Sequence, residues 1–89
     1  MRVLWSPSTV RDVWRIHDYV HQFSPRAAQN LADRLFSAGA SLATEPHRGR
    51  PVPGTPLREL TLIYPYIIRY QVVGEEVHIL RIRHGMRSG

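Results

Sequence analysis

The fold of this chain follows from YIIRYQVVGEEVHILRIRHG, residues 66–85. This segment contains two runs rich in β-branched and aromatic residues, separated by a Gly-Glu pair, which is the pattern of a β-hairpin. The run before it, LRELTLI at residues 57–63, has a similar composition and is separated from the hairpin by a Tyr-Pro pair. The three runs together predict a three-stranded antiparallel meander.

The pairing register of this hairpin has two candidates. A two-residue turn that begins at Gly74 places cations among apolar side chains, with Arg81 and Arg83 beside Tyr66, Ile68 and Tyr70. A shift of one residue, with a bulge near Gly74, instead places Tyr66, Ile68, Tyr70, Val72, Leu80 and Ile82 on one face and Arg69, Arg81 and Arg83 on the other. The shifted register is preferred because it separates apolar from charged side chains.

Two amphipathic helices are predicted upstream of the meander. Each begins at a Ser-Pro pair, at residues 6–7 and 24–25, because serine caps free backbone N–H groups and proline fits the first helical turn. Apolar residues then recur at helical spacing as far as about His21 in the first segment and Leu42 in the second. The short turn between the segments predicts an antiparallel helical hairpin.

The remaining segments complete a single α+β domain, residues 1–89. RVLW, residues 2–5, has the composition of a short N-terminal strand. TEPHRGRPVPGTP, residues 44–56, holds too many prolines and glycines to remain regular. It is either a structural connector or, through Arg48 and Arg50, an anion-binding loop. The predicted order is therefore N-terminal strand, antiparallel helical hairpin, irregular connector and three-stranded antiparallel meander.

Positive charge is concentrated in the predicted sheet. The 89 residues include 12 basic residues, all arginine, against 7 acidic residues, a net charge of +5. Residues 48–89 hold seven of the arginines against three acidic residues. A G+C-rich genome explains the choice of arginine over lysine as well as any function does. However, one helical hairpin covers only one face of a sheet, so we expect the arginines on the other face, available to an anionic partner.

Several classes of site are not expected. The chain has no cysteine, and therefore no disulfide or thiolate zinc site. It has no glycine-rich phosphate loop or HExxH helix, and His17 and His21 have no evident third ligand, so neither a cofactor nor a metal is predicted. No apolar run is long enough for a membrane span or a signal peptide, which predicts a cytoplasmic protein that does not bind membranes.

Two polar residues of the predicted strands are assigned provisional roles. Glu59, beside Arg58, is expected to be a solvated charge. His84 is expected to be structural, with general acid–base catalysis as the alternative because histidine titrates near neutral pH.

The order of these segments resembles a known family. The residues that carry the resemblance are YVHQFSPRAAQNLADRL in the hairpin, EPHRGRPVPG in the loop, LREL at residues 57–60, the segment 66–85 and Arg87. They resemble the RelE/ParE superfamily of bacterial toxins from type II toxin–antitoxin systems, and the ParE branch more than RelE itself. The resemblance implies a compact, ribonuclease-like microbial toxin fold and a cognate antitoxin whose C-terminal segment wraps the toxin. It also implies that only the toxin–antitoxin complex binds operator DNA.

The resemblance implies two alternative targets. RelE-like members cut messenger RNA in the ribosome with basic residues and commonly a tyrosine near the C-terminus. Arg58 and Arg87 match that set, and His84 is the available replacement base, but Leu60 and Ile67 stand where that branch has basic residues. No terminal tyrosine follows Arg87 either. ParE-like members instead poison DNA gyrase, and their C-terminal strand and tail are implicated.

The leading hypothesis is a ParE-like toxin of a plasmid-stabilisation-type module that inhibits DNA gyrase by binding. Its expected target-binding residues are Arg58, Arg69, Arg81, Arg83, His84 and Arg87. Its expected antitoxin-binding residues are Trp14, Tyr19, Leu31 and Leu35, on the helices. One alternative is a ribosome-dependent messenger-RNA endoribonuclease with Arg58, Arg87 and His84 as catalytic residues. The other is a non-toxic nucleic-acid-binding or partner-scaffold module.

Overall fold

The computed structural model describes residues 1–86, so Arg87 of the predicted target-binding set lies outside the described residues. The fold is α+β, as the sequence predicts. Its elements follow one another as β1 (Arg2–Trp5), α1 (Pro7–His21), α2 (Pro25–Ala40), the 3-10 turn η1 (Ser41–Ala43), β2 (Arg50–Pro51), β3 (Leu57–Leu60), β4 (Tyr66–Val73) and β5 (Glu76–His84).

Both helices start where the sequence predicts, because serine side chains cap their first turns. Ser6 Oγ accepts a hydrogen bond from the backbone N–H of Thr9 at 3.1 Å, and Ser24 Oγ accepts one from Ala27 at 3.1 Å. Proline follows each cap. α1 ends at the predicted residue, whereas α2 ends two residues early and passes into η1. Neither helix is long and apolar enough to cross a membrane, and the described residues contain no other α-helix.

The sheet is larger than the predicted meander. β3, β4 and β5 form the meander, and the sheet extends on both sides in the order β1-β5-β4-β3-β2. β1 pairs parallel with β5, so the N-terminal strand becomes one edge. β2 pairs with β3 inside the segment predicted to be irregular, and a proline is tolerated there because an edge strand needs fewer N–H donors. β3 ends at Leu60 rather than at Ile63.

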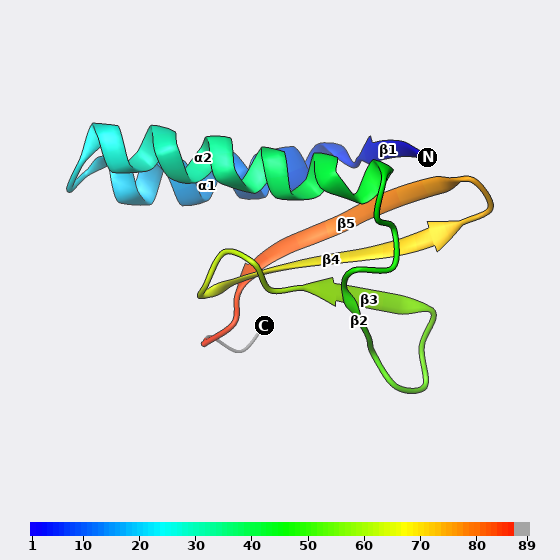
Figure 1. Cartoon of the computed structure of the whole chain (residues 1–89). Coiled ribbons are helices and arrows are strands. Elements are labelled where there is room, and N and C mark those ends of the chain that lie inside the picture. The colour runs from blue at the N-terminus through cyan, green and yellow to red at the C-terminus, as the bar shows by residue number, and fades with distance from the viewer. Residues whose placement is uncertain (87–89) are drawn as a thin grey trace.

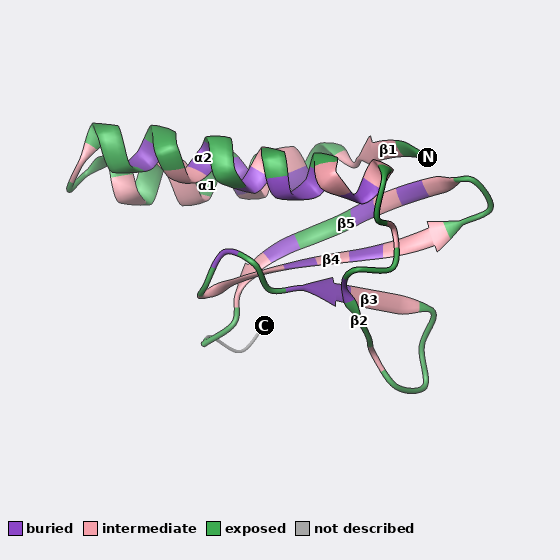
Figure 2. Ribbon diagram, viewed as in Figure 1, coloured by how far each residue is buried: buried purple, intermediate pink, exposed green. Residues whose placement is uncertain are grey.

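The helices cover one face of the sheet only. α1 and α2 lie side by side over that face, and the tip of the helical hairpin extends past the ends of the strands (Figure 1). Buried residues line the helix surfaces that face the sheet and alternate along the strands beneath (Figure 2). The largest fully buried side chains are Tyr70, Leu35, Leu42, Ile68, Ile79, Val13, Val77 and Thr9. No helix among residues 1–86 covers the opposite face, as predicted.

The register of β4 and β5 combines the two predicted arrangements. Near the turn the pairs follow a two-residue glycine turn, with Tyr70 opposite Ile79. An extra residue in β5, Leu80, then shifts the register by one, which places Arg69 opposite Arg81. The prediction of a bulge near the turn is wrong, and so is the prediction that Leu80 joins the core face. Leu80 is 39% exposed because it is the bulged residue itself.

Candidate functional site

Arginine side chains from neighbouring strands meet on the sheet face turned away from the helices, here called the outer face. Directly opposed residues of an antiparallel ladder share a face. Arg69 lies opposite both Arg81 and Glu59, and Glu59 also lies opposite Arg50. Arg83, two residues after Arg81, points to the same side. We call these five residues, Arg50, Glu59, Arg69, Arg81 and Arg83, the arginine face.

Glu59 lies among these arginines and is almost fully buried. Its Oε2 accepts hydrogen bonds from Arg69 Nε at 3.1 Å and Nη2 at 2.7 Å, and from Arg83 Nη2 at 3.4 Å. The residue is only 8% exposed, so the prediction of a solvated charge is wrong. The reason is the cross-strand geometry, which places Arg69 directly opposite and lets its guanidinium cover the carboxylate.

The folded protein favours the charged form of Glu59. Hydrogen bonds from Arg69 lower the pKa of the Glu59 carboxyl below its usual value, and the nearby charges of Arg69 and Arg83 act in the same direction, whereas burial opposes the shift. The carboxylate is therefore ionised at neutral pH and cancels one positive charge. The side chains of Arg69 and Arg83 are 32% and 23% exposed, so both still reach solvent in part.

Arg58 does not belong to the arginine face. It lies opposite Tyr70, on the side of the sheet that faces the helices. Its Nη1 donates hydrogen bonds to the carbonyl oxygens of Gly49 at 2.7 Å and His47 at 3.3 Å, in the connector before β2. The prediction that Arg58 joins the other arginines in one outward patch is wrong, because strand alternation places it and Glu59 on opposite faces.

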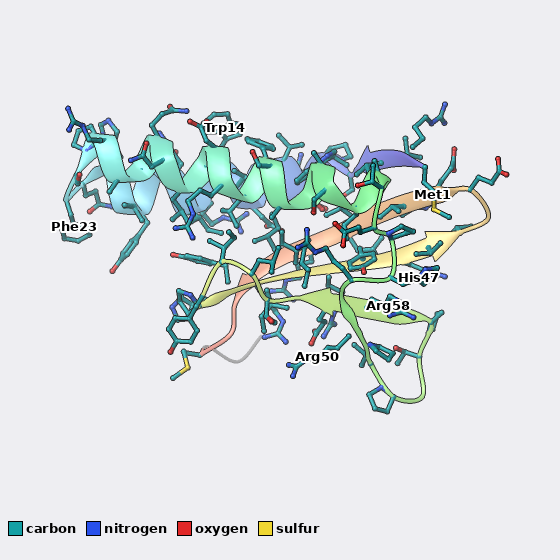
Figure 3. The ribbon with its side chains drawn as sticks, viewed as in Figure 1. Met1, Trp14, Phe23, His47, Arg50 and Arg58 are labelled. Atoms are coloured by element: carbon teal, nitrogen blue, oxygen red, sulfur yellow. The ribbon has the colours of Figure 1, made fainter. Side chains whose placement is uncertain are left out.

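Tyr70 holds this connector against the sheet. Its hydroxyl donates to the carbonyl oxygen of Pro46 at 2.8 Å and accepts from the backbone N–H of Gly49 at 2.9 Å, and the residue is fully buried. A Cβ at position 49 would lie 2.7 Å from the Tyr70 ring, so glycine is required there. The Tyr70 contact therefore fixes the carbonyl groups that bind Arg58. Gly49 directly precedes Arg50 of β2, and both arginines lie near this edge of the sheet (Figure 3).

His84 faces away from the arginine face. It lies opposite Tyr66, on the helix-facing side, and the two rings meet edge-on with centroids 5.5 Å apart. Its Nδ1 accepts a hydrogen bond from the backbone N–H of Met86 at 3.1 Å, which leaves Nε2 to carry the proton of the neutral ring. His84 and its neighbour Arg83 are therefore directed to opposite sides of the sheet.

Exposed aromatic side chains lie on the helical hairpin. Trp14, on the side of the helices away from the sheet, is 44% exposed, and its ring centroid is 5.9 Å from that of Phe36 (Figure 3). Phe36 in turn lies 5.3 Å from Trp5. Nearer the tip, Tyr19 is 52% exposed and lies 5.5 Å from Phe23, also by ring centroids. These rings form two clusters, Trp14–Phe36–Trp5 and Tyr19–Phe23, which together we call the aromatic row.

The two leucines of the predicted antitoxin-binding set are placed differently. Leu35 is fully buried in the core, so the prediction that it offers surface to a partner is wrong, because it points toward the sheet. Leu31 is partly buried and packs against the same core. Phe36, next to Leu35, was not singled out by the helical spacing, although its position one residue further round α2 brings it to Trp14.

His17 and His21 form no metal centre with other residues among positions 1–86. The Nδ1 atom of His17 lies 2.9 Å from Asp18 Oδ1, and the two histidine rings are 5.6 Å apart by centroid. Within those positions there is no group of three or more histidine, cysteine, aspartate or glutamate side chains that could hold a metal ion.

Asp12 is a structural contributor that sequence patterns do not reveal. Its Oδ2 accepts a hydrogen bond from the backbone N–H of Ile82 at 3.0 Å, which ties α1 to β5. The partner is a main-chain group 70 residues away, and no periodicity or motif marks such a pairing. For Glu59 a signal does exist, because it is an acidic residue in a strand predicted to pair with an arginine-bearing one.

Comparisons with known proteins agree with this architecture. A family model for the ParE toxin of the type II toxin–antitoxin system parDE matches residues 3–89. Toxin RelE2 of Caulobacter vibrioides is 50% identical over 86 residues, which cover 97% of each chain. Toxin RelE1 of the same organism is 39% identical over 89 residues, covering 97% of this chain and 95% of the relative.

A solved structure supports the same assignment. A chain from the chromosomal ParDE toxin–antitoxin system of P. aeruginosa superposes with a TM-score of 0.81 at 28% identity, covering 94% of this chain and 95% of that one. Toxins of this kind are paired with an antitoxin, so the assignment implies a cognate antitoxin for this chain. The chain belongs to the ParE toxin family of type II toxin–antitoxin systems.

Proposed function

We propose that this toxin acts by binding DNA gyrase and not by cutting RNA. Membership of the ParE family supports a gyrase target, because ParE-like members of the superfamily poison that enzyme. The observation that carries the choice is the buried Glu59 carboxylate, which binds Arg69 and Arg83 within the arginine face. Those two guanidinium groups are partly neutralised before any phosphate arrives.

RNA cleavage needs cations that stabilise the phosphorane and a group that accepts the 2′-hydroxyl proton. The candidates among the described residues do not converge on one point. Arg58 is bound to backbone carbonyls beside Tyr70, whereas His84 lies beside Tyr66, four residues away along β4. These positions are separated by roughly 13 Å along the strand direction. Ile67, where RelE-like members carry a basic residue, supplies no charge.

The same face is well suited to binding. It presents four guanidinium groups against one carboxylate, and Arg50 and Arg81 are exposed. Guanidinium groups bind carboxylate or phosphate groups in a bidentate manner and remain charged when a partner covers them. An acidic protein surface, or the DNA held by gyrase, offers such groups. Inhibition by contact requires no proton transfer, so the absence of a convergent acid–base pair in residues 1–86 is no obstacle.

The cognate antitoxin is proposed to cover the aromatic row with an amphipathic segment. Exposed Trp14 and Tyr19 offer apolar area next to polar helix surface, which an amphipathic helix of the antitoxin could cover with its apolar face. The complex, and not the toxin alone, is proposed to bind operator DNA.

The test uses the purified full chain, separated from its antitoxin, with gyrase, plasmid DNA and ATP. We expect loss of supercoiling and accumulation of cleaved plasmid that appears when gyrase is denatured. Arg81→Ala/Arg83→Ala is expected to raise the half-inhibitory concentration at least tenfold. Arg11→Ala/Arg26→Ala, which removes the same charge from the exposed helix surface, is the matched control and is expected to act like the parent chain.

A ribosome-dependent endoribonuclease is the second candidate, because two relatives carry the name RelE. The same protein is therefore added to ribosomes programmed with a short messenger RNA. Cut transcripts together with unaffected gyrase would reverse the proposal. Normal growth of bacteria that produce the chain without its antitoxin would count against both candidates.

A further inference from the structure

The bulge at Leu80 decides where two arginines of β5 point. If the register near the turn continued without it, Arg81 would lie opposite Ile68 and Arg83 opposite Tyr66, on the helix-facing side. The extra residue instead places Arg81 opposite Arg69 and brings Arg83 within 3.4 Å of the Glu59 carboxylate. Arg81 and Arg83 therefore belong to the arginine face only because β5 contains one residue more than its partner.

A bulge interrupts the ladder, so its backbone groups need other partners. β1 ends at Trp5, opposite Ile79, and therefore gives β5 no partner strand beyond this point. The Ser6 N–H still lies 3.4 Å from the Ile79 carbonyl oxygen, and two side chains of α1 bind the backbone groups that flank the bulge. The Thr9 hydroxyl, fully buried, donates to the carbonyl oxygen of Ile79 at 3.1 Å, and Asp12 Oδ2 accepts from the N–H of Ile82 at 3.0 Å.

We propose that Asp12 is a positioning residue for the arginine face: by binding the Ile82 N–H it holds the bulge that turns Arg81 and Arg83 outward. The bond is charge-assisted, which makes it stronger than a bond between neutral groups. The Asp12 side chain is only 13% exposed, and its other oxygen is held by Arg15 at 3.2 Å. Asp12 itself lies on the helix side and does not form part of the arginine face.

The inference is tested by two measurements, amide hydrogen exchange and gyrase inhibition, and only the second rests on the proposed function. Asp12→Asn removes the charge but keeps the size of the side chain. Asp18→Asn is the matched control, because it removes the same charge from α1 at an exposed site beside His17. The first readout is amide hydrogen exchange, where Asp12→Asn is expected to lower the protection of Ile82 roughly tenfold relative to Val77. Asp18→Asn is expected to leave the Ile82 amide unchanged.

The second readout is the half-inhibitory concentration for gyrase. Asp12→Asn is expected to raise it at least fivefold, and Asp18→Asn is expected to leave it unchanged. Loss of protection at Ile82 with unimpaired inhibition would overturn the positioning role. Unchanged protection would overturn it as well. Should Asp12→Asn fail to fold, Asp12→Glu, which keeps a carboxylate on a longer side chain, is tested by the same pair of readouts.

Failure of the proposed gyrase function can be distinguished from failure of the positioning role of Asp12. If the unmodified chain does not inhibit gyrase, the second readout becomes affinity for a short duplex DNA, a polyanion that the arginine face is expected to bind whatever its natural target. Asp12→Asn is then expected to bind this duplex at least threefold more weakly than Asp18→Asn, which has the same net charge. Equal affinity of the two variants would overturn the inference even in that case.

Discussion

Glu59 and Arg69 form a cross-strand ion pair in which both Nε and Nη2 of the guanidinium bind one carboxylate oxygen, at 3.1 and 2.7 Å. The pair lies on the sheet face opposite α1 and α2, yet the glutamate is only 8% exposed because the arginine lies over it. A single acidic residue thus lowers the charge of a surface that is otherwise formed by arginines. The same residue gives that surface a fixed geometry.

Removal of this charge is expected to convert the arginine face into a better polyanion-binding surface. Glu59→Gln should bind a short duplex DNA more tightly, and the slope of log K against log salt concentration should become steeper by about 0.9, the value for one additional phosphate contact. Glu75→Gln, in the exposed turn before β5, changes the net charge equally. Titrations at several salt concentrations compare the two. Identical slopes would mean that Glu59 does not restrain Arg69 and Arg83.

The stability contributed by Glu59 is expected to disappear in acid. The pKa of this carboxyl is lower in the folded protein than in the unfolded chain, chiefly because of the hydrogen bonds from Arg69. Such a group stabilises the fold above its unfolded pKa, about 4.3, and loses that contribution as the pH falls through the folded value. Glu59→Gln should therefore be less stable by roughly 1–2 kcal/mol at pH 7.

The difference between Glu59→Gln and the parent chain should shrink progressively below about pH 5. Urea unfolding at a series of pH values measures it. A difference that stays constant down to strong acid would contradict the assigned pKa shift.

Tyr70→Phe is expected to loosen the connector before β2. The substitution removes the hydroxyl that joins the Pro46 carbonyl to the Gly49 N–H, and buried groups left without a partner cost about 1–3 kcal/mol. Tyr64→Phe serves as the control because Tyr64 is 81% exposed, and it should change the free energy of unfolding by less than about 0.5 kcal/mol. Thermal or denaturant unfolding distinguishes the two, and equal effects would argue against an anchoring role for Tyr70.

Trp14→Ala is expected to weaken antitoxin binding without unfolding the toxin. Trp14 is 44% exposed, so its removal leaves the core intact, and an aromatic residue at the centre of an interface commonly contributes about 2 kcal/mol or more. Calorimetric titration with the cognate antitoxin should show at least a tenfold loss. Leu35→Ala provides the contrast, since a cavity in the core costs about 2–5 kcal/mol of stability. Unchanged affinity for Trp14→Ala would place the antitoxin elsewhere.

Local patterns in the chain were enough to predict the helices, the meander and the uncovered sheet face. Ser6 and Ser24 mark the two helix starts because capping joins residues three positions apart, and such local geometry can be predicted from a sequence. The contact partners of individual arginines could not be predicted in the same way. Arg58 and Arg69 look equivalent along the chain, but one binds loop carbonyls and the other a carboxylate.

Amino-acid order alone was sufficient wherever the deciding interactions join near neighbours: helix caps, apolar periodicity and the place of the hairpin between β4 and β5. The tertiary structure was needed wherever the deciding contact joins residues that are distant in the sequence. Asp12 of α1 binds the Ile82 N–H beside the bulge, and Glu59 of β3 lowers the charge of the arginine face by binding Arg69 and Arg83. Each of these contacts forms because separate elements pack together. Contacts between residues so far apart in the sequence produce no repeating pattern from which they could be predicted.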